Sequence, residues 1–252
     1  EIIKKYEPWI DYWVSEKDAG HANAINKGFS VATGEQGGWL SSDDIYLPGA
    51  FHKIAEFWVA QGRPQSLMTG TKLKGNENLE EIIQEEQSPY TITHLLEKCL
   101  LEQPATFFPL DLFRKVGGVD ERYFMALDYN LWLSMIRVGS GLIFTCSDYA
   151  ITRIHPNTKS KNFHQRSIYE SLQTVWHNFK VISNTWLKRY LTMLILPQRL
   201  QLRWLRKLLY IIRNILFSTL TTLFETFNLM HYQKSYSCEI FVENQENEMI
   251  SN

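Results

Sequence analysis

Two adjacent carboxylates stand where a short apolar run ends. Residues 38–41 are typical of a buried strand, and Asp43 and Asp44 follow almost directly. In open α/β sheets, ligands gather outside the carboxyl ends of the strands. Neighbouring acids repel each other unless a cation lies between them, and Mg²⁺ or Mn²⁺ binds carboxylate oxygens while keeping positions open for a diphosphate. The pair therefore indicates a metal and diphosphate site. The alternative is a turn that caps the next helix.

A third acid, Asp128, begins a helical pattern among large apolar residues. Burial raises the pKa of a carboxyl group and a nearby metal lowers it, so such an acid can serve as a general base near neutral pH. The alternative is an N-terminal aspartate that the helix dipole favours.

Further polar and aromatic groups could complete a site. Gln103 and Thr106 flank a tight apolar segment and could line a sugar pocket, to which we also assign Trp132, or they belong to an ordinary buried strand. Alternation along an extended segment places Arg153 and His155 on one face. Lys159 follows in the same segment, and arginine and lysine suit a diphosphate leaving group. A solvated basic loop is the alternative.

The elements that must position these groups follow from the apolar pattern. We expect helices over residues 21–33, 48–60, 110–116 and 126–138, strands over 38–41, 66–71 and 142–146, and a polar, mobile excursion over 75–88. The apolar face of the first helix comprises Ala22, Ile25, Phe29 and Ala32. This alternation of strands and helices predicts an α/β layer fold.

The C-terminal third differs in composition. Residues 171–224 contain no Asp or Glu, and Pro197 divides their helical pattern into two helices. By their spacing, one face gathers cations and another gathers leucines and isoleucine: Arg199, Arg203, Arg206 and Lys207 against Leu202, Leu205, Leu208, Leu209 and Ile212. That pattern is typical of a helix lying on an anionic membrane surface. The alternative is a helical pair packed on the domain with its cations in water.

Length and composition limit the remaining possibilities. We divide the 252 residues into a domain (1–167), a basic helical extension (168–235) and a disordered tail (236–252). A net charge of -1 argues against nucleic acid as the main ligand. The three cysteines have no zinc or disulfide spacing. Without a secretory signal or a membrane-spanning run, we expect a cytoplasmic protein, peripheral on the inner face of the membrane if the extension binds lipid.

The order and spacing of these motifs closely resemble glycosyltransferase family 2. The resemblance covers about residues 1–161 and is most specific over 15–50, where Asp18, Gly20, Asn26 and the Asp43-Asp44 pair lie. The segments 103–108, 116–121 and 126–132 also fit.

That resemblance implies a GT-A fold, with a mostly parallel sheet flanked by helices, and transfer of a sugar from a nucleotide-diphosphate donor with inversion. It implies that Asp44, with Asp43, holds Mn²⁺ or Mg²⁺ and that Asp128 deprotonates the acceptor hydroxyl. It implies a donor site that comprises Asp18, Gly20, Asn26, Asp43, Arg153 and His155.

The sequence also departs from the family pattern. The family begins with a strand and turn that hold the nucleotide base, and we expect this chain to lack them. Ser41, Leu127 and Asn130 stand where other members carry acids. The alternative is thus a catalytically idle sugar- or nucleotide-binding domain, or one that mainly attaches to a membrane. Because the Gln-x-x-Arg-Trp signature of processive members is missing, we expect addition of one sugar to a glycan or lipid-linked acceptor in polysaccharide synthesis.

Overall fold

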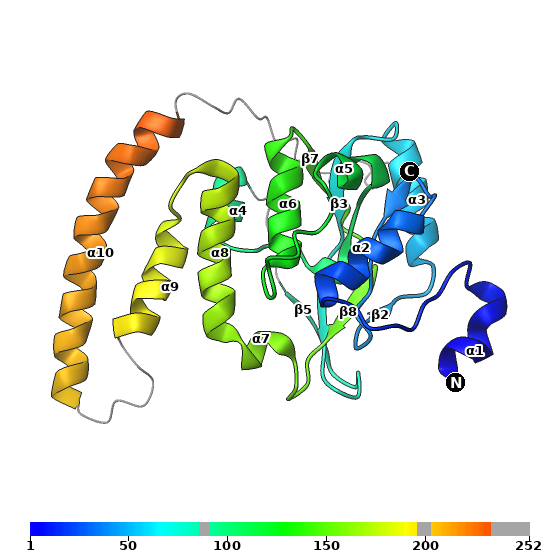
Figure 1. The fold of residues 1–252 in the computed structure, drawn as a ribbon, viewed down its shortest axis with the longest axis horizontal. Coiled ribbons are helices and arrows are strands. Elements are labelled where there is room, and N and C mark those ends of the chain that lie inside the picture. The colour runs from blue at the N-terminus through cyan, green and yellow to red at the C-terminus, as the bar shows by residue number, and fades with distance from the viewer. Residues whose placement is uncertain (86–90, 196–202, 233–252) are drawn as a thin grey trace, which may run out of the picture.

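The computed structural model describes residues 1–85, 91–195 and 203–232 as sheets flanked by helices, with a row of helices at the C-terminal side (Figure 1). One sheet has the order β1-β6-β3-β7, formed by Gln36–Gly37, Thr106–Pro109, Ser66–Thr69 and Gly141–Phe144. The other has the order β2-β8-β4-β5, formed by Ile45–Tyr46, Ala150–Arg153, Lys72–Gly75 and Ile82–Glu85. The α/β class is confirmed. Among the described strands, β3/β7 and β4/β8 pair in parallel and the other pairs are antiparallel, so pairing is mixed rather than mostly parallel.

The predicted helices are present with slightly shorter bounds. They are α2 (His21–Val31), α3 (Ala50–Ala60), α5 (Leu110–Lys115) and α6 (Leu127–Arg137). Short helical turns are added at α1 (Ile2–Tyr6), η1 (Glu7–Trp9), α4 (Ile92–Glu97) and η2 (Gln103–Ala105). The predicted face of α2 is confirmed, because Ala22 and Ile25 are buried in the core and Phe29 and Ala32 pack against it.

Two predicted segments differ from the structure. Residues 38–41 are not a strand; pairing with β6 occurs two residues earlier, in β1. A Cβ on Gly37 would lie 2.8 Å from the rings of Phe29 and Phe108, so only glycine allows that close approach. The excursion expected over 75–88 is instead partly a hairpin, since β5 pairs with β4 through residue 85.

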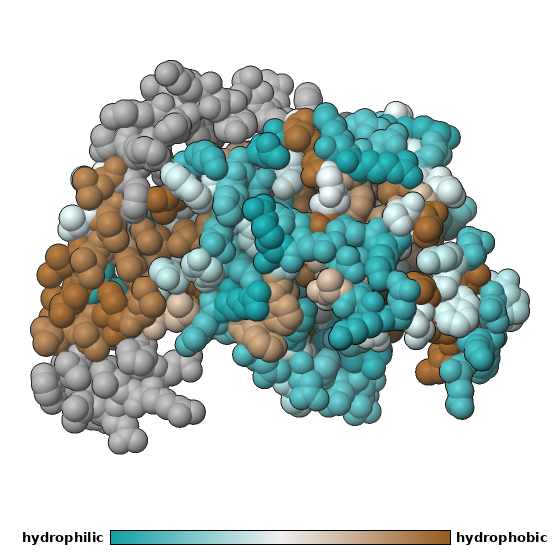
Figure 2. Space-filling model, in the orientation of Figure 1, coloured by the Kyte–Doolittle hydropathy of each residue, from teal (hydrophilic) through white to brown (hydrophobic). Residues whose placement is uncertain are grey.

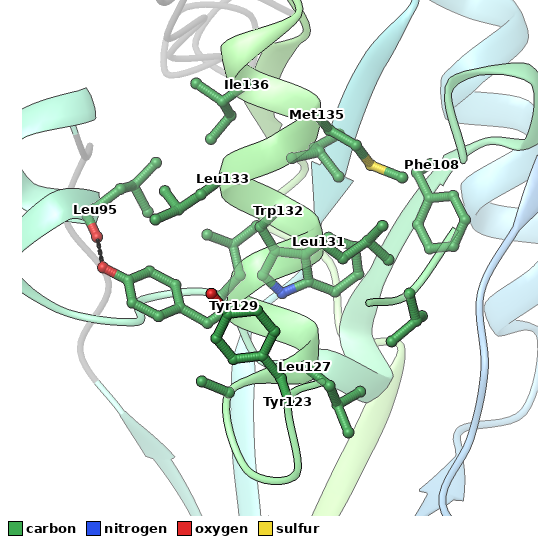
Figure 3. Close-up of a cluster of buried hydrophobic side chains, with 14 of the residues drawn as sticks. Leu95, Phe108, Tyr123, Leu127, Tyr129, Leu131, Trp132, Leu133, Met135 and Ile136 are labelled. Carbon is green, nitrogen blue, oxygen red and sulfur yellow. Dashed lines mark hydrogen bonds between the residues drawn. The ribbon is translucent and has the colours of Figure 1, made fainter. Parts of the chain in front are cut away.

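The core forms around α6. Its side chains pack toward Leu95 on one side and toward Phe108 on the other (Figure 3). The Tyr129 hydroxyl also donates to the Leu95 carbonyl. The helix that carries Asp128 is therefore fixed by burial on nearly every side.

The C-terminal helices are α7 (Lys159–Asn162), α8 (His164–Phe179), α9 (Asn184–Ile195) and α10 (Arg203–Tyr232). The domain boundary predicted at residue 167 falls inside α8, which packs on α6, and core side chains continue through Val175 and Phe179 to Trp186. The helical pattern is interrupted after Lys180, whose φ of 55° ends α8.

Several predictions for this region lie outside the described residues. They concern Pro197, Arg199, Leu202, the side chains of Arg203, Leu205 and Arg206, and the tail 236–252. Within the described residues, no helix is both long and apolar enough to cross a membrane.

Candidate active site

The three predicted acids and Arg153 all line one cavity of about 310 Å³. It is lined by His21, Trp39, Ser41, Asp43, Asp44, Gln103, Phe124, Met125, Leu127, Asp128, Thr152, Arg153, Asn157, Thr158 and Lys159. The lining comes from the start of α2, the loop after β1, η2, the start of α6 with the two residues Phe124 and Met125 before it, the end of β8, and residues 157–159. Segments far apart in sequence thus meet at one place, and Asp43, Asp44, Asp128 and Arg153 are among the residues that they bring together.

Asp44 is held at this cavity by strand pairing. Antiparallel pairing of β2 with β8 brings the residue before β2 next to the end of β8. There Asp44 Oδ1 accepts a hydrogen bond from the backbone N–H of Arg153 at 2.9 Å. Burial, with smaller effects of Asp43 and Glu102, raises the pKa of Asp44 to about 6 against the opposing Arg153 N–H. Because crowded carboxylates are costly to ionise, a bound cation would stabilise this group.

Arg153 lines the same cavity. Its Nε is buried and has no hydrogen-bond partner among the described residues. A buried guanidinium nitrogen without a partner is costly, and the positive charge of the guanidinium group suits an anion bound beside it. His155 is not part of the described lining; its Nε2 lies 3.1 Å from Asp43 Oδ2 and so orients that carboxylate.

Asp128 is the second residue of α6. Its Oδ1 accepts the N–H of Tyr129 at 2.7 Å. Burial raises the pKa of Asp128 to about 6, Glu102 adds to the effect, and Lys159 opposes it. A carboxylate with this pKa is ionised at neutral pH and is a stronger proton acceptor than an exposed aspartate.

The predicted sugar pocket is only partly brought to the cavity. Gln103 lines it and its Nε2 donates to the Trp39 carbonyl at 2.6 Å. Thr106 is buried in β6, where its Oγ1 lies 3.1 Å from Thr69 Oγ1, so it belongs to the sheet. Trp132 is 1% exposed and stacks on Trp39 at 5.4 Å. It therefore supports the cavity wall and is not part of the described lining.

The predicted nucleotide elements lie beside the cavity. Asp18 Oδ1 accepts the N–H of Gly20 at 2.9 Å, and Gly20, with a φ of 129°, precedes α2, whose first residue His21 lines the cavity. Their role in donor binding stays a prediction. Asn26 is engaged elsewhere: its amide accepts from Val119 N at 2.9 Å and donates to Val119 O at 2.8 Å. It ties α2 to the loop before α6.

Lys159, a cation of the segment after Arg153, also lines the cavity. Its Nζ lies 4.2 Å from the centre of the Phe124 ring and 3.4 Å from the Phe124 carbonyl oxygen. Burial lowers the pKa of Lys159, while Glu170 and Asp128 oppose that shift. The sequence signal was its place in the basic segment after Arg153, but spacing alone does not show which of those cations faces the cavity.

The acids fit a metal that is shared with a substrate. Over the described ranges, no group of three or more His, Cys, Asp or Glu residues converges as a metal-ligand set. Mg²⁺ is commonly bound by one or two carboxylates together with substrate phosphates. Asp43 and Asp44, which both line the cavity, match that donor set.

Comparison with known proteins supports the family. Residues 1–107 match the model of glycosyl transferase family 2. The resemblance to glycosyltransferase family 2 is confirmed. An uncharacterized glycosyltransferase of Rickettsia typhi is 27% identical over 186 residues, which cover 71% of this chain and 57% of that protein. One from Mycobacterium tuberculosis is 28% identical over 142 residues, 56% of this chain and 53% of its own length. The chain thus spans about half the length of these family relatives.

The fold is GT-A-like, as predicted. The crystal structure of S. aureus TarS superposes with a TM-score of 0.52 and 14% identity, covering 79% of this chain and 36% of that one. A structure of TarS 1-349 in complex with UDP-GlcNAc gives 0.51 and 13%, covering 77% and 58%. At these identities the likeness concerns the fold.

Proposed function

We propose that this chain is the catalytic part of a transferase that moves one sugar from a nucleotide-diphosphate donor to an acceptor hydroxyl. One observation carries the proposal: Asp44, Arg153 and Asp128 line a single cavity and differ in chemistry. A half-buried acid that favours a cation, an arginine that carries positive charge, and a base of raised pKa are the groups such a transfer needs. The family match and the UDP-GlcNAc bound to TarS support a nucleotide-sugar donor.

The leaving group would lie between the acids and the cations. Arg153 and Lys159 would contact the diphosphate, and His155 would keep Asp43 oriented through their 3.1 Å contact. Asp44, with Asp43, would hold Mn²⁺ or Mg²⁺, which when bound neutralises charge on the departing diphosphate. The cavity would thus offer the diphosphate both cationic side chains and a bound metal ion.

Asp128 would act as the general base. The acceptor oxygen attacks the anomeric carbon, its proton passes to the Asp128 carboxylate, and the bond to the diphosphate breaks with its electron pair leaving on the phosphate oxygen. A single displacement of this kind inverts the anomeric configuration. Trp39, Phe124 and Met125 line the cavity beside this acid and offer apolar surface to a sugar ring.

The acceptor would be a glycan. A lipid-linked glycan is favoured because the outer face of α10 suits contact with a lipid surface. Exposed apolar side chains run along that helix: Leu208, Tyr210, Ile211, Ile212, Ile215, Leu216 and Leu223. Figure 2 shows brown surface over α9 and α10. On the face toward α9, Arg213 is buried and reaches Thr192. Exposed Lys188, Arg189 and Lys207 accompany the apolar face, which suits an anionic lipid surface.

A donor screen tests the function. The full-length protein would be incubated with UDP-, GDP- and dTDP-sugars, with Mn²⁺ or Mg²⁺, and released nucleoside diphosphate would be measured. We expect release from at least one donor, and its loss in an Asp128→Asn variant. Donor binding without release, with or without a glycan acceptor, would instead favour the idle sugar-binding alternative.

A further inference from the structure

Glu170, on α8, is a buried carboxylate that the proposed chemistry does not use. It is 4% exposed, and its Oε2 accepts three consecutive backbone N–H groups, from Phe124 at 3.0 Å, Met125 at 2.6 Å and Ala126 at 3.1 Å. Three amides that converge on one oxygen stabilise a negative charge there. The loop before α6 is thereby tied to α8.

The other oxygen of Glu170 is also engaged. Oε1 accepts from Arg166 Nε at 2.6 Å, one turn earlier on α8. The Arg166 guanidinium lies 4.5 Å from the centre of the Phe124 ring, and Lys159 Nζ lies 4.2 Å from the same centre. The charge of Glu170 is thus paired, and the Phe124 ring is contacted by two cations.

Glu170 fixes the segment that leads into α6. The N-cap residue is Ala126, which provides no side-chain hydrogen bond to the first turn of the helix, and its own N–H is one of the three that Glu170 binds. The other two, from Phe124 and Met125, lie just before the helix, so Glu170 sets the course of the chain into its first turn. Asp128 lies in that first turn, and Phe124, Met125 and Leu127 line the cavity on either side of Ala126.

We propose that Glu170 is a positioning residue: it fixes the residues before α6 and so holds the Asp128 carboxylate beside the place that the acceptor hydroxyl would occupy. This inference rests on the proposed function, in which Asp128 is the base. A shift of about 1 Å in a reacting group can cost about 100-fold in rate. A loop held by three amide bonds to one carboxylate limits such shifts.

Glu97 offers a matched control. Its carboxylate accepts from Thr185 N at 2.6 Å, Asn184 N at 3.1 Å and Ser183 Oγ at 3.0 Å, at the start of α9. It ties two segments together in the same chemical way but is not part of the described cavity lining. We expect replacement of Glu97 to cost stability in the same way while leaving the contacts of the 124–126 amides with Glu170 in place.

The experiment compares Glu170→Ala, Glu170→Gln and Glu97→Ala in the full-length protein. For each, kcat and the donor KM would be measured per folded molecule, together with the midpoint of thermal unfolding. We expect Glu170→Ala to lower kcat roughly 10- to 100-fold with donor KM nearly unchanged. Glu170→Gln keeps an oxygen for the amides and should fall between the wild type and alanine. Glu97→Ala should lower the midpoint but keep kcat.

The outcomes separate the two proposals. Wild-type kcat in both Glu170 variants overturns the positioning role and leaves the proposed function intact. An equal loss of kcat in Glu97→Ala also overturns it, because the effect would then be general destabilisation. No transfer by the wild-type protein with any donor overturns the proposed function, and the positioning role with it.

Discussion

Replacing Asp128 with asparagine should make the protein more stable while removing its turnover. Burial raises the pKa of Asp128 from an ordinary 3.8 to about 6, so the folded state binds a proton more tightly than the unfolded state. The stability this group contributes is complete below its unfolded pKa and is lost as pH rises through about 6. At neutral pH and above, the wild-type protein therefore carries the cost of a buried carboxylate.

The pKa difference sets the size of the effect. At about pH 8 the cost of ionised Asp128 is about 3 kcal/mol, and at about pH 4.5 it falls to about 1 kcal/mol. Asparagine has nearly the same shape, stays neutral, and its Oδ1 can still accept the Tyr129 N–H. The free energy of unfolding of Asp128→Asn should thus exceed that of the wild type by these amounts.

Urea unfolding at both pH values, followed by tryptophan fluorescence without ligands, measures the difference. Asp111→Asn is the control, because the Asp111 side chain is 85% exposed and its replacement should give no pH-dependent gain. In the same preparation, loss of the base should lower kcat by about two to four orders of magnitude. An Asp128→Asn protein that is no more stable than the wild type at high pH, or that turns over normally, would refute this reasoning.

Three further outcomes follow from the site and its surroundings. The rate should decline below about pH 6 as Asp128 is protonated; a flat profile through that range would move the base elsewhere. Arg153→Gln should weaken UDP binding by about tenfold or more in calorimetry, whereas Arg114→Gln, at an exposed ion pair, should not; equal affinities would remove Arg153 from the donor site. Co-sedimentation with anionic but not neutral vesicles should occur, weaken with salt, and decrease in Ile215→Ser but not in Ile83→Ser, two changes at exposed isoleucines; equal binding by both variants would count against α10.

The spacing of apolar residues predicted those helices in which buried side chains recur with the helical period. The face of α2 and the course of α6 follow from apolar spacing, because each helix packs against the core. Motif order singled out Asp43, Asp44 and Asp128, and strand pairing then explains why Asp44 meets the backbone of Arg153. Periodicity could not show that the Thr106 side chain contacts the neighbouring strand rather than the cavity. All four residues of β6 are buried, so the pattern does not distinguish one face of the strand from the other.

Contacts between elements that are distant in sequence could not be predicted from the sequence. Glu170 is the one acidic residue of α8, so no motif marks it. Only the packing of α8 on α6 brings it to the amides of residues 124–126. Lys159 is one of several cations in its segment, and only the fold shows it at the cavity. The hairpin of β4 and β5 was likewise missed, because Ile82 and Ile83 are exposed and polar residues surround them.

The cavity should bind a nucleoside diphosphate together with a divalent metal held by Asp44. Calorimetric titration of UDP and GDP into the full-length protein, with and without Mn²⁺, measures this, using Asp44→Asn beside the wild type. We expect Mn²⁺ to strengthen binding to the wild type and Asp44→Asn, though folded, to lose this dependence. The same Mn²⁺ dependence in both proteins would contradict it.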